Sequence, residues 1–508
     1  MRRIFSSKRD SFPVRFGIFL IIAALITGFP SSYSVDGNNN QPSENLEIYT
    51  WYDLDDIRYN LSGDHILMNN LNSTTEGYEE LASPTANEGK GWQPIGYSTP
   101  GVVSCMAARP GEDYGLFGTL DGQGHEIRDL FINRSDENNV GLFYYIRGRI
   151  INLGLTNVTV TGSGNVGSLV GWNEGTVDNS YSIGNVAGES TVGGLTGSNR
   201  GTVLNSYSSG NVNGSSCVGG LAGSMYYGSV ENSHSMCSVI GVDDVGGLLG
   251  YSYSGTVSNS YSTGNVTGDS DVGGLLGLNG WKAASGSNIY DCYSGGNVDG
   301  SLRVGGLVGH NYYGTVSNSY ATGNVTGDSD VGGLVGVNSW EVGNREENAV
   351  RGSYSTGNIN GNQHVGGLVG HNYNYGTVSN SYATGNVTGD SDVGGLVGLN
   401  GLDVMQTGGR IRNSYSTGNV NGNQDVGGLV GHTVLHSTVL NSFWDTETSG
   451  LSTSDGGTGK NTTEMKNITT FSGVGWNITA VSNTTMRDTS YIWNIVNNVT
   501  YPFLSWQP

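Results

Sequence analysis

Histidines at recurring positions are the first side chains that could do chemistry in this chain of 508 residues. A zinc peptidase of the HExxH type needs two histidines, and the pair His125-Glu126 continues as HEIRDL without the second one. His310, His371 and His432 each follow a VGGLVG segment. They fall on alternate copies of a repeat, so we expect them about 10 Å apart, too far to share one metal ion. We predict external polar residues at a turn and no metal site.

Aspartates recur in the turn GDSDVGG and are the second candidate for chemistry. A polysaccharide lyase or hydrolase needs clustered carboxylates, sometimes with Ca²⁺, Lys or Arg. An active site should interrupt the repeat, but the sequence has no unique acidic cluster. It also has no P-loop, GxSxG or Cys–His arrangement. We therefore predict no catalytic residues, no cofactor and no enzyme, with a lyase or hydrolase as the alternative. A weak structural Ca²⁺ site between neighbouring copies stays open at Asp328, Asp330, Asp390 and Asp392.

A repeat of about 27 residues must position these side chains. The 23 residues 314–336 recur letter for letter at 376–398. An NSY-like element follows each VGGLxG segment, and GNV follows most. The element VGGLxG, with the variant VGSLVG, begins at Val166, Val192, Val218, Val245, Val272, Val304, Val331, Val365, Val393 and Val426.

Three short extended stretches make up each copy: VGGLVG, TVSNSY and NVTG. Gly, Asn, Asp and Ser between them suit turns, and the repeats show no apolar spacing typical of helices. One copy cannot bury its own apolar face, but stacked copies can. The sequence thus predicts an all-β, right-handed parallel β-helix of about ten three-strand rungs with N- and C-terminal caps.

Stacking places each residue on its copy in the next rung, about 4.8 Å away. Val316 then lies in one column with Val257 and Val378, and the Asn of NSY could form an amide ladder. Position 319 is Ser or Cys in all ten copies, which suits a small buried residue. Tyr320 and its copies are therefore expected to form an external aromatic stack.

Inserts lengthen every second rung after Val272, always between VGGLxG and the next strand. They predict three loops on one edge of the rod, with Trp281, Trp340 and Leu402 at matching places. Extra loops of a solenoid gather on a binding face, and exposed Trp suits sugars or protein. The alternative is that each loop folds back and buries its own Trp.

The N-terminus and the charge indicate an exported protein. Basic residues precede the apolar run at 16–29, and small residues precede a cut before Val35, so residues 1–34 are read as a signal peptide, with an uncleaved anchor as the alternative. The sequence has no second apolar run, so we expect no transmembrane domain in the mature chain. The net charge of −21 argues against nucleic acid as a partner. We expect a secreted, extracellular protein that can associate with the cell surface as a monomer.

The cysteines and the glycosylation sequons say little about the fold or the function. Cys105, Cys217, Cys237 and Cys292 could pair in three ways, and their spacing does not choose among them. Of the N-x-S/T sequons, the five near the C-terminus are expected to be accessible for glycosylation: Asn461, Asn467, Asn477, Asn483 and Asn498.

The segment VGGLVGHNYYGTVSNSYATGNVTG resembles the GLUG motif, and the resemblance covers about residues 161–445. The leader, with IYTWYDLDDIR and GLFGTLDGQGHEIRDLFINRS, and the closing WNIVNNVTYPFLSW also resemble such proteins. The resemblance implies an extracellular or cell-surface protein with adhesin-like or structural roles and no defined activity. GLUG motifs also occur beside peptidase domains that cleave immunoglobulin A.

The predicted organisation follows from these features. The protein is expected to be an adhesion or envelope-structural rod that presents loops to a cell-surface polysaccharide or protein; a passive spacer is a further alternative. The segments are a signal peptide at 1–34, an N-terminal cap at 35–115, first rungs at 116–160, the repeat array at 161–445 and a C-terminal cap at 446–508.

Overall fold

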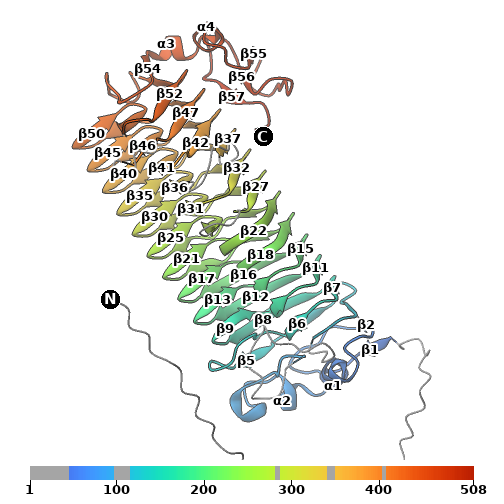
Figure 1. The fold of residues 1–508 in the computed structure, drawn as a ribbon. Helices are drawn as coiled ribbons and strands as arrows, with labels where there is room; N and C mark the ends of the chain where they lie inside the picture. The colour runs from blue at the N-terminus through green and yellow to red at the C-terminus, as the bar shows by residue number, and fades with distance from the viewer. Residues whose placement is uncertain (1–44, 97–114, 281–285, 340–348, 403–407, 508) are drawn as a thin grey trace, which may run out of the picture. The chain divides into compact units, whose positions relative to one another are not determined.

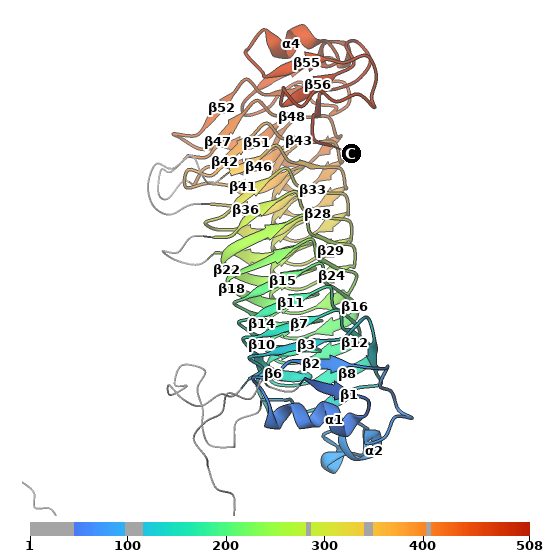
Figure 2. The same ribbon diagram turned by 90° about the vertical axis from the view of Figure 1, so that its right-hand side faces the viewer.

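Short strands stacked in parallel form most of the protein. The chain divides into Met1–Pro42 and Ser43–Pro508, and all described residues belong to the second unit. Within it the strands wind into the rungs of a parallel β-helix, as predicted (Figure 1 and Figure 2). The predicted signal peptide and Cys105 lie outside the described residues. The structure is a computed structural model that describes residues 45–96, 115–280, 286–339, 349–402 and 408–507.

One rung contains five short strands rather than the three predicted short strands. The representative rung consists of β30 (Leu302–Gly305), β31 (Val308–Asn311), β32 (Thr315–Ser317), β33 (Tyr320–Ala321) and β34 (Val325–Thr326). Two of the three predicted stretches are divided, VGGLVG between β30 and β31 and TVSNSY at Asn318, whose φ is 49°. The stacked strands of successive rungs form three sheets, here called A, B and C.

Sheet C contributes one strand to each rung and has ten strands among the described residues, which matches the ten predicted rungs. Register is kept from rung to rung, as in the pairs Val304 with Val331 and Val331 with Val365. Its strands are β9 (Gly164–Gly167), β13 (Ser190–Gly193), β17 (Ser216–Gly219), β21 (Asp243–Gly246), β25 (Ser270–Gly273), β30, β35 (Ser329–Gly332), β40 (Gln363–Gly366), β45 (Ser391–Gly394) and β50 (Gln424–Gly427).

Sheet A contributes two strands to each rung, fused into one in β18 (Ala222–Glu231) and β22 (Leu249–Ser258). The first strands are β6 (Phe143–Ile146), β10 (Val170–Asn173), β14 (Thr196–Asn199), β26 (Leu276–Asn279), β31, β36 (Val335–Asn338), β41 (Val369–Asn372), β46 (Val397–Asn400) and β51 (Val430–Thr433). The second strands are β7 (Arg149–Ile151), β11 (Thr176–Asp178), β15 (Thr202–Leu204), β27 (Asn288–Tyr290), β32, β37 (Ala349–Arg351), β42 (Thr377–Ser379), β47 (Arg410–Arg412) and β52 (Thr438–Leu440).

Sheet B holds the strands that carry the Tyr and NV positions of the repeat. They are β4 (Glu126–Arg128), β5 (Phe131–Asn133), β8 (Gly154–Thr161), β12 (Tyr181–Ala187), β16 (Tyr207–Asn213), β19 (His234–Ser235), β20 (Ser238–Ile240), β23 (Tyr261–Ser262), β24 (Val266–Thr267), β28 (Tyr293–Ser294), β29 (Val298–Asp299), β33, β34, β38 (Tyr354–Ser355), β39 (Ile359–Asn360), β43 (Tyr382–Ala383), β44 (Val387–Thr388), β48 (Tyr415–Ser416), β49 (Val420–Asn421), β53 (Phe443–Asp445) and β54 (Thr458–Lys460).

Valine and leucine columns fill the core between the sheets. Val257, Val316 and Val378 lie in one column with Ile289 and Val350 between them, as predicted, and all five are buried. The Gly of GNV has a steric role, because a methyl group at that position would overlap the carbonyl oxygen of its copy in the preceding rung.

The parallel stack begins upstream of the repeat array. In sheet A, β1 (Leu46–Ile48), β2 (His65–Leu67) and β3 (Thr119–Asp121) stack in order and continue into β7. Helices α1 (Trp51–Asp56) and α2 (Tyr78–Leu81) lie at this end of the stack (Figure 2). Two short 3₁₀ turns, η1 (Ile57–Tyr59) and η2 (Asn87–Gly89), complete the segment.

The chain ends in a small folded segment at the other end of the stack (Figure 1). It contains α3 (Thr462–Met465), α4 (Ile468–Ser472), β55 (Ile478–Ala480), β56 (Trp493–Ile495) and β57 (Phe503–Leu504). Its aromatic residues form a second hydrophobic cluster with the last tyrosines of sheet B. No helix in the described part of the chain combines the length and apolar character needed to cross a membrane.

Tyr320 and its copies form a continuous aromatic stack, as predicted. From Tyr181 to Tyr415 the ring centroids of neighbours are 4.6 to 5.0 Å apart and the rings are nearly parallel. The C-terminal segment covers the end of this stack, since Trp506 packs against Tyr354 and donates a hydrogen bond to the Gly352 carbonyl. The stack is therefore external over its first rungs and buried over its last.

The Ser before each of these tyrosines forms a buried ladder. The hydroxyl of Ser353 donates to the Arg351 carbonyl at 2.9 Å and accepts from the Ser319 N–H at 3.2 Å. The same pair of bonds recurs along the stack at Ser206, Ser233, Ser319, Ser381, Ser414 and Ser442. In each of these rungs one hydroxyl thus satisfies two buried backbone groups.

The amide ladder forms at a different Asn from the one predicted. Asn318 and its copies in NSY lie at bends with positive φ. The ladder is built instead by the last Asn of the first sheet A strands, where the Asn311 amide donates to Asn338 and the Asn338 amide to Asn372, each at 2.9 Å. These three side chains are fully buried. The bend removes the NSY position from regular strand pairing, which is why the ladder is elsewhere.

Replacing one Ser of the ladder tests this account of stability. In Ser353→Ala the buried N–H of Ser319 loses its acceptor, so we expect the free energy of unfolding to fall by about 1–3 kcal/mol. Ser353→Cys is the matched control, because Cys292 occupies the equivalent place in its own rung. We expect this variant to lose less free energy of unfolding than Ser353→Ala. Urea denaturation followed by circular dichroism measures both. Equal losses in the two variants would contradict the ladder.

Candidate functional site

Two columns of side chains meet where sheet C passes into sheet A. The corner column is formed by the residue that precedes the Val of each sheet C strand. The strand column is formed by the third residue of each first strand in sheet A. Every corner residue has a φ between 48° and 56°, so it lies in a bulge that leaves it without a Cα partner. The corner column is Asn165, Thr191, Cys217, Asp244, Asp271, Arg303, Asp330, His364, Asp392 and Asp425.

The strand column carries aromatic residues in early rungs and histidines in late ones. Register places its members in the order Tyr145, Trp172, Ser198, Ser224, Tyr251, Leu278, His310, Val337, His371, Leu399 and His432. The three histidines are on alternate rungs, as predicted, but they lie in strands rather than at turns, and His371 is buried rather than external. The sequence analysis did not foresee that each of them meets the corner column.

The same three-residue contact occurs three times, two rungs apart. An Asp of the corner column meets the corner residue and the strand-column His of the following rung. The three sets, here called triads 1 to 3, are Asp271, Arg303 and His310; Asp330, His364 and His371; and Asp392, Asp425 and His432.

Triad 1 is a closed ion pair. Arg303 donates to both carboxylate oxygens of Asp271, at 2.5 Å from Nε and 2.7 Å from Nη2. His310 Nδ1 lies 3.4 Å from the same Asp271 oxygen. Burial would raise the pKa of Asp271, but the hydrogen bonds from Arg303 and His310 hold that pKa below its ordinary value.

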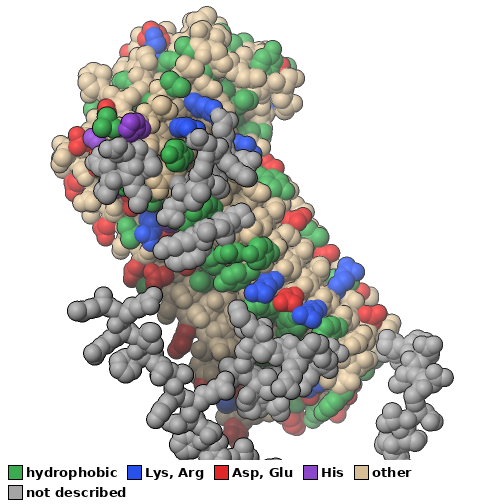
Figure 3. Space-filling model, in the orientation of Figure 1, with side chains coloured by type: hydrophobic (Ala, Val, Ile, Leu, Met, Phe, Trp, Pro, Cys, Tyr) green, Lys and Arg blue, Asp and Glu red, His purple; other side chains and the backbone are tan. Residues whose placement is uncertain are grey.

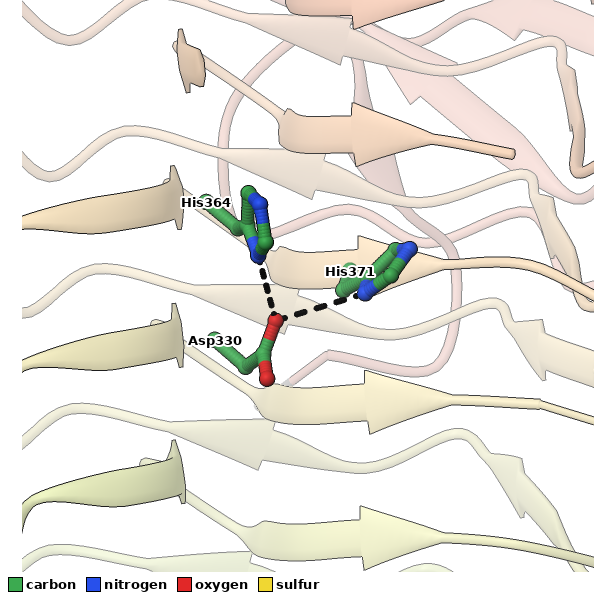
Figure 4. A group of neighbouring side chains, drawn as sticks. All are labelled: Asp330, His364 and His371. Atoms are coloured by element: carbon green, nitrogen blue, oxygen red, sulfur yellow. Dashed lines mark hydrogen bonds and ion pairs between the residues drawn. The ribbon is translucent and has the colours of Figure 1, made fainter. Parts of the chain in front are cut away.

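Triad 2 has the same shape with His364 in place of the arginine (Figure 4). The Nδ1 atoms of His364 and His371 lie 2.7 and 3.3 Å from one oxygen of Asp330. Burial opposes the charge on Asp330, yet contacts with both histidines hold its pKa well below the ordinary value. His371 Nε2 lies 2.9 Å from the Gly401 carbonyl oxygen.

Triad 3 is the most open of the three. Potential ligand atoms of Asp392, Asp425 and His432 lie within 4.8 Å of one another. Asp425 is exposed, and His432 is 40% exposed at its side chain. Burial raises the pKa of Asp392. A cluster of two acids and one histidine therefore spans the last two rungs of the array.

An aromatic patch with arginines occupies the early rungs of the same sheet. Glu174 is at its centre and accepts hydrogen bonds from Tyr145 Oη at 2.6 Å, Arg147 Nε at 3.1 Å and Trp172 Nε1 at 3.3 Å. The Arg200 guanidinium lies over the Trp172 ring, 4.8 Å from its centroid. The polar and aromatic groups are thus held in fixed orientations before any ligand binds.

Tyrosines of β18 and β22 extend this patch. Arg200 also lies over Tyr226, whose ring meets Tyr251 and Tyr253 at 5.7 and 6.1 Å between centroids. Tyr227 packs edge-on against Tyr253 and is 71% exposed. Figure 3 shows hydrophobic and basic side chains gathered near the middle of this face. We define the aromatic–arginine patch as Tyr145, Arg147, Trp172, Glu174, Arg200, Tyr226, Tyr227, Tyr251 and Tyr253.

The predicted binding loops begin next to these columns. Trp281 and Trp340 lie outside the described residues, and Leu402 is half-buried. The segments that contain them follow β26, β36 and β46, which carry the strand column. The predicted Ca²⁺ ligands take other partners, since Asp328 and Asp390 accept from Asn362 and Asn423 at 3.0 Å. That site stays an untested prediction.

Glycosylation and the thiols can also be placed. Of the five C-terminal sequons, Asn461, Asn477, Asn483 and Asn498 are exposed, whereas Asn467 is half-buried. Their modification stays a prediction. Cys217, Cys237 and Cys292 are free thiols.

Sequence reasoning missed the aromatic–arginine patch and His364. The signal for the patch was present in MYYGS and YSYSG, where two rungs depart from the VGxN pattern. The signal for His364 was the spacing QHVGGLVGH, with a histidine on each side of the turn between sheets. Neither signal says which residues meet until the register between rungs is known.

The stacked rungs and their repeated turn define a β-helical repeat protein. The family model of the GLUG motif matches residues 243–267, 300–326, 361–388 and 389–421. These four segments of the chain therefore carry GLUG repeats, and each matched segment contains the successive strands of one rung.

Two curated proteins share part of the sequence. Halomucin of Haloquadratum walsbyi is 36% identical over 102 residues, which are 20% of this chain and 1% of halomucin. A protein described as a Gly-rich membrane protein of Evansella cellulosilytica is 36% identical over 96 residues, which are 18% of this chain and 10% of that protein. The chain thus spans a small part of either relative.

A solved structure, described as a candidate immunoglobulin A1 protease from Bacteroides ovatus, aligns over 93% of this chain and 94% of its own. The TM-score is 0.26 and the sequence identity 16%, so this likeness carries no structural or functional argument.

Asp244 makes the corner column sensitive to pH. It is followed in the column by Asp271 and lies 3.7 Å from the Cys217 sulfur. Burial, and next the charge of Asp271, raise the pKa of Asp244 to about 7. The folded state therefore favours the protonated form, and the stabilisation that protonation gives is lost as the pH rises from about 4 through 7.

Asp244→Asn should remove the loss of stability that ionisation of Asp244 causes at higher pH. We expect it to raise the free energy of unfolding by roughly 2–4 kcal/mol at pH 8 and by much less at pH 4.5, since each unit of pKa corresponds to about 1.4 kcal/mol. Urea denaturation at the two pH values measures the difference. Asp243→Asn, at the exposed neighbour, is the control and should behave like wild type. A gain of equal size at both pH values would refute the assignment.

Proposed function

We propose that this chain is an extracellular or cell-surface β-helical repeat protein that binds polysaccharide, with the aromatic–arginine patch as its binding site. The observation that carries the proposal is the patch itself, in which Trp172, Tyr226, Tyr227 and Tyr253 are accessible beside Arg147 and Arg200. Aromatic side chains with polar tips suit a ligand that has both apolar faces and hydroxyl groups.

The shape and rigidity of the patch support an extended ligand. It runs from β6 to β22, four rung steps that span roughly 19 Å at about 4.8 Å each. Several rings of a sugar chain fit such a length. The hydrogen bonds of Glu174 fix the side chains beforehand, which lowers the entropy lost on binding.

The surface location rests on other support. One curated relative is described as a membrane protein, neither is named as an enzyme, and the sequence predicts export. We propose binding without catalysis. The loops with Trp281 and Trp340 follow strands of the same sheet and could extend the binding face.

Binding to cell-wall polysaccharides on a glycan array tests the patch. We expect Trp172→Ala and Tyr227→Ala each to weaken binding about tenfold, the loss of one aromatic contact. Tyr59→Ala, at an exposed Tyr outside the patch, is the matched control and should bind like wild type.

Three outcomes would change the proposal. Unchanged binding in both patch variants would refute the patch, and loss of binding only in Trp281→Ala/Trp340→Ala would move the site to the loops. Release of reducing or unsaturated sugar ends by the wild-type protein would indicate a lyase or hydrolase instead.

A further inference from the structure

We propose that Asp330, His364 and His371 of triad 2 bind a single Zn²⁺ ion that links two neighbouring rungs. Two imidazoles and one carboxylate are a ligand set that zinc commonly takes. Their ligand atoms lie within 4.8 Å of one another, so one ion can reach all three after small side-chain rotations.

The tautomer of His371 points to a cation at this place. Its Nε2 faces the Gly401 carbonyl at 2.9 Å, and because a carbonyl oxygen only accepts, Nε2 carries the hydrogen. A neutral ring then presents the bare Nδ1 lone pair to an Asp330 oxygen 3.3 Å away. Two acceptors at that distance need a positive charge between them, either a proton on Nδ1 or a metal ion.

The repeat supplies an internal comparison for that cation. In triad 1 the Arg303 guanidinium stands beside Asp271 and His310 at the place that His364 takes in triad 2. Triad 1 therefore carries a permanent cation within the chain. Triad 2 has the same backbone, acid and strand-column His, but an imidazole replaces the guanidinium. Unlike a guanidinium, an imidazole can release its proton and bind a metal ion, so triad 2 offers two nitrogen ligands and one oxygen ligand to an external cation.

The surroundings suit a bound metal ion. The side chains of Asp330 and His371 are 15% and 8% exposed, so the ligands are largely held by packing, while His364 is more open. The bond from His371 Nε2 to the Gly401 carbonyl is the outer contact that typically orients a metal-binding histidine. Three protein ligands leave a fourth position for a water or a ligand oxygen.

The ion would join strands of different rungs. Asp330 belongs to β35, whereas His364 and His371 belong to β40 and β41 of the next rung. The described chain between them ends at Ser339 and resumes at Ala349, so the ion would fasten the two rungs beside that insert. Triad 3 has only one histidine and more exposed ligands, and we expect weaker binding there.

Titration of the tag-free, metal-free full chain with Zn²⁺ tests the site by isothermal calorimetry and thermal unfolding. We expect one tight site per chain and a rise in Tm with Zn²⁺ but not with Mg²⁺. His364→Arg recreates triad 1, so we expect this variant to fold. We expect it to weaken tight Zn²⁺ binding more than about 100-fold, which exceeds the effect typical of changing a residue that only orients a ligand. His310→Ala, in triad 1, is the matched control and should bind like wild type.

X-ray absorption of the zinc-loaded protein should show two imidazole nitrogens and one carboxylate oxygen. Absence of tight Zn²⁺ binding in the wild type would mean that a proton supplies the cation and would overturn the proposal. Tight binding that survives in His364→Arg, or that is lost only in His432→Ala, would overturn it as well, because the ion would then lie at another site.

Discussion

In-register parallel pairing of successive rungs is the constraint on which the rest of the structure depends. Each residue lies on its own copy about 4.8 Å away, so a buried polar side chain has to bond groups that recur in every rung, either its own copy or the repeated backbone. Serine and asparagine meet this condition because each can donate and accept at once. The ladders at Ser353 and Asn338 therefore satisfy buried hydrogen-bonding groups in successive rungs. The Val and Leu columns fill the remaining space of the core.

The same stacking creates a difficulty for charged residues, since equal charges in one column repel. The corner column resolves it by alternation over two rungs: Arg303 follows Asp271, and His364 follows Asp330. Where two acids follow one another in the column, either one of them has a raised pKa or one of them is exposed to solvent. Asp244 beside Asp271 has a raised pKa, and Asp425 beyond Asp392 lies open to solvent. The identical segments 314–336 and 376–398 therefore place the same acid, Asp330 and Asp392, in the corner column two rungs apart.

A scaffold that repeats its backbone can change its surface by single side chains. Along the strand column the residue type changes from Tyr145 and Trp172 to His371 and His432 with no change of register. The aromatic–arginine patch and triad 2 therefore lie at different rungs, and both include members of this column. The two ends need separate solutions, because an open sheet edge would pair with other chains. Helices α1 and α2 lie at one end, and the Trp-rich C-terminal segment packs at the other.

The sequence by itself determined the parallel β-helix, the ten rungs, the buried Ser at position 319 and the aromatic stack at Tyr320, because a repeat with fixed spacing places equivalent residues over one another. It also placed the three histidines on alternate rungs. The tertiary structure decided that the C-terminal segment covers the last rings of the aromatic stack. Only the tertiary structure decided that the Asn ladder runs through Asn311 rather than Asn318, and that His371 meets His364 and Asp330. The physical reason is that these contacts depend on the bulge at each corner residue and on how sheet C folds onto sheet A. Spacing along the chain fixes which residues share a column, but not which two columns touch.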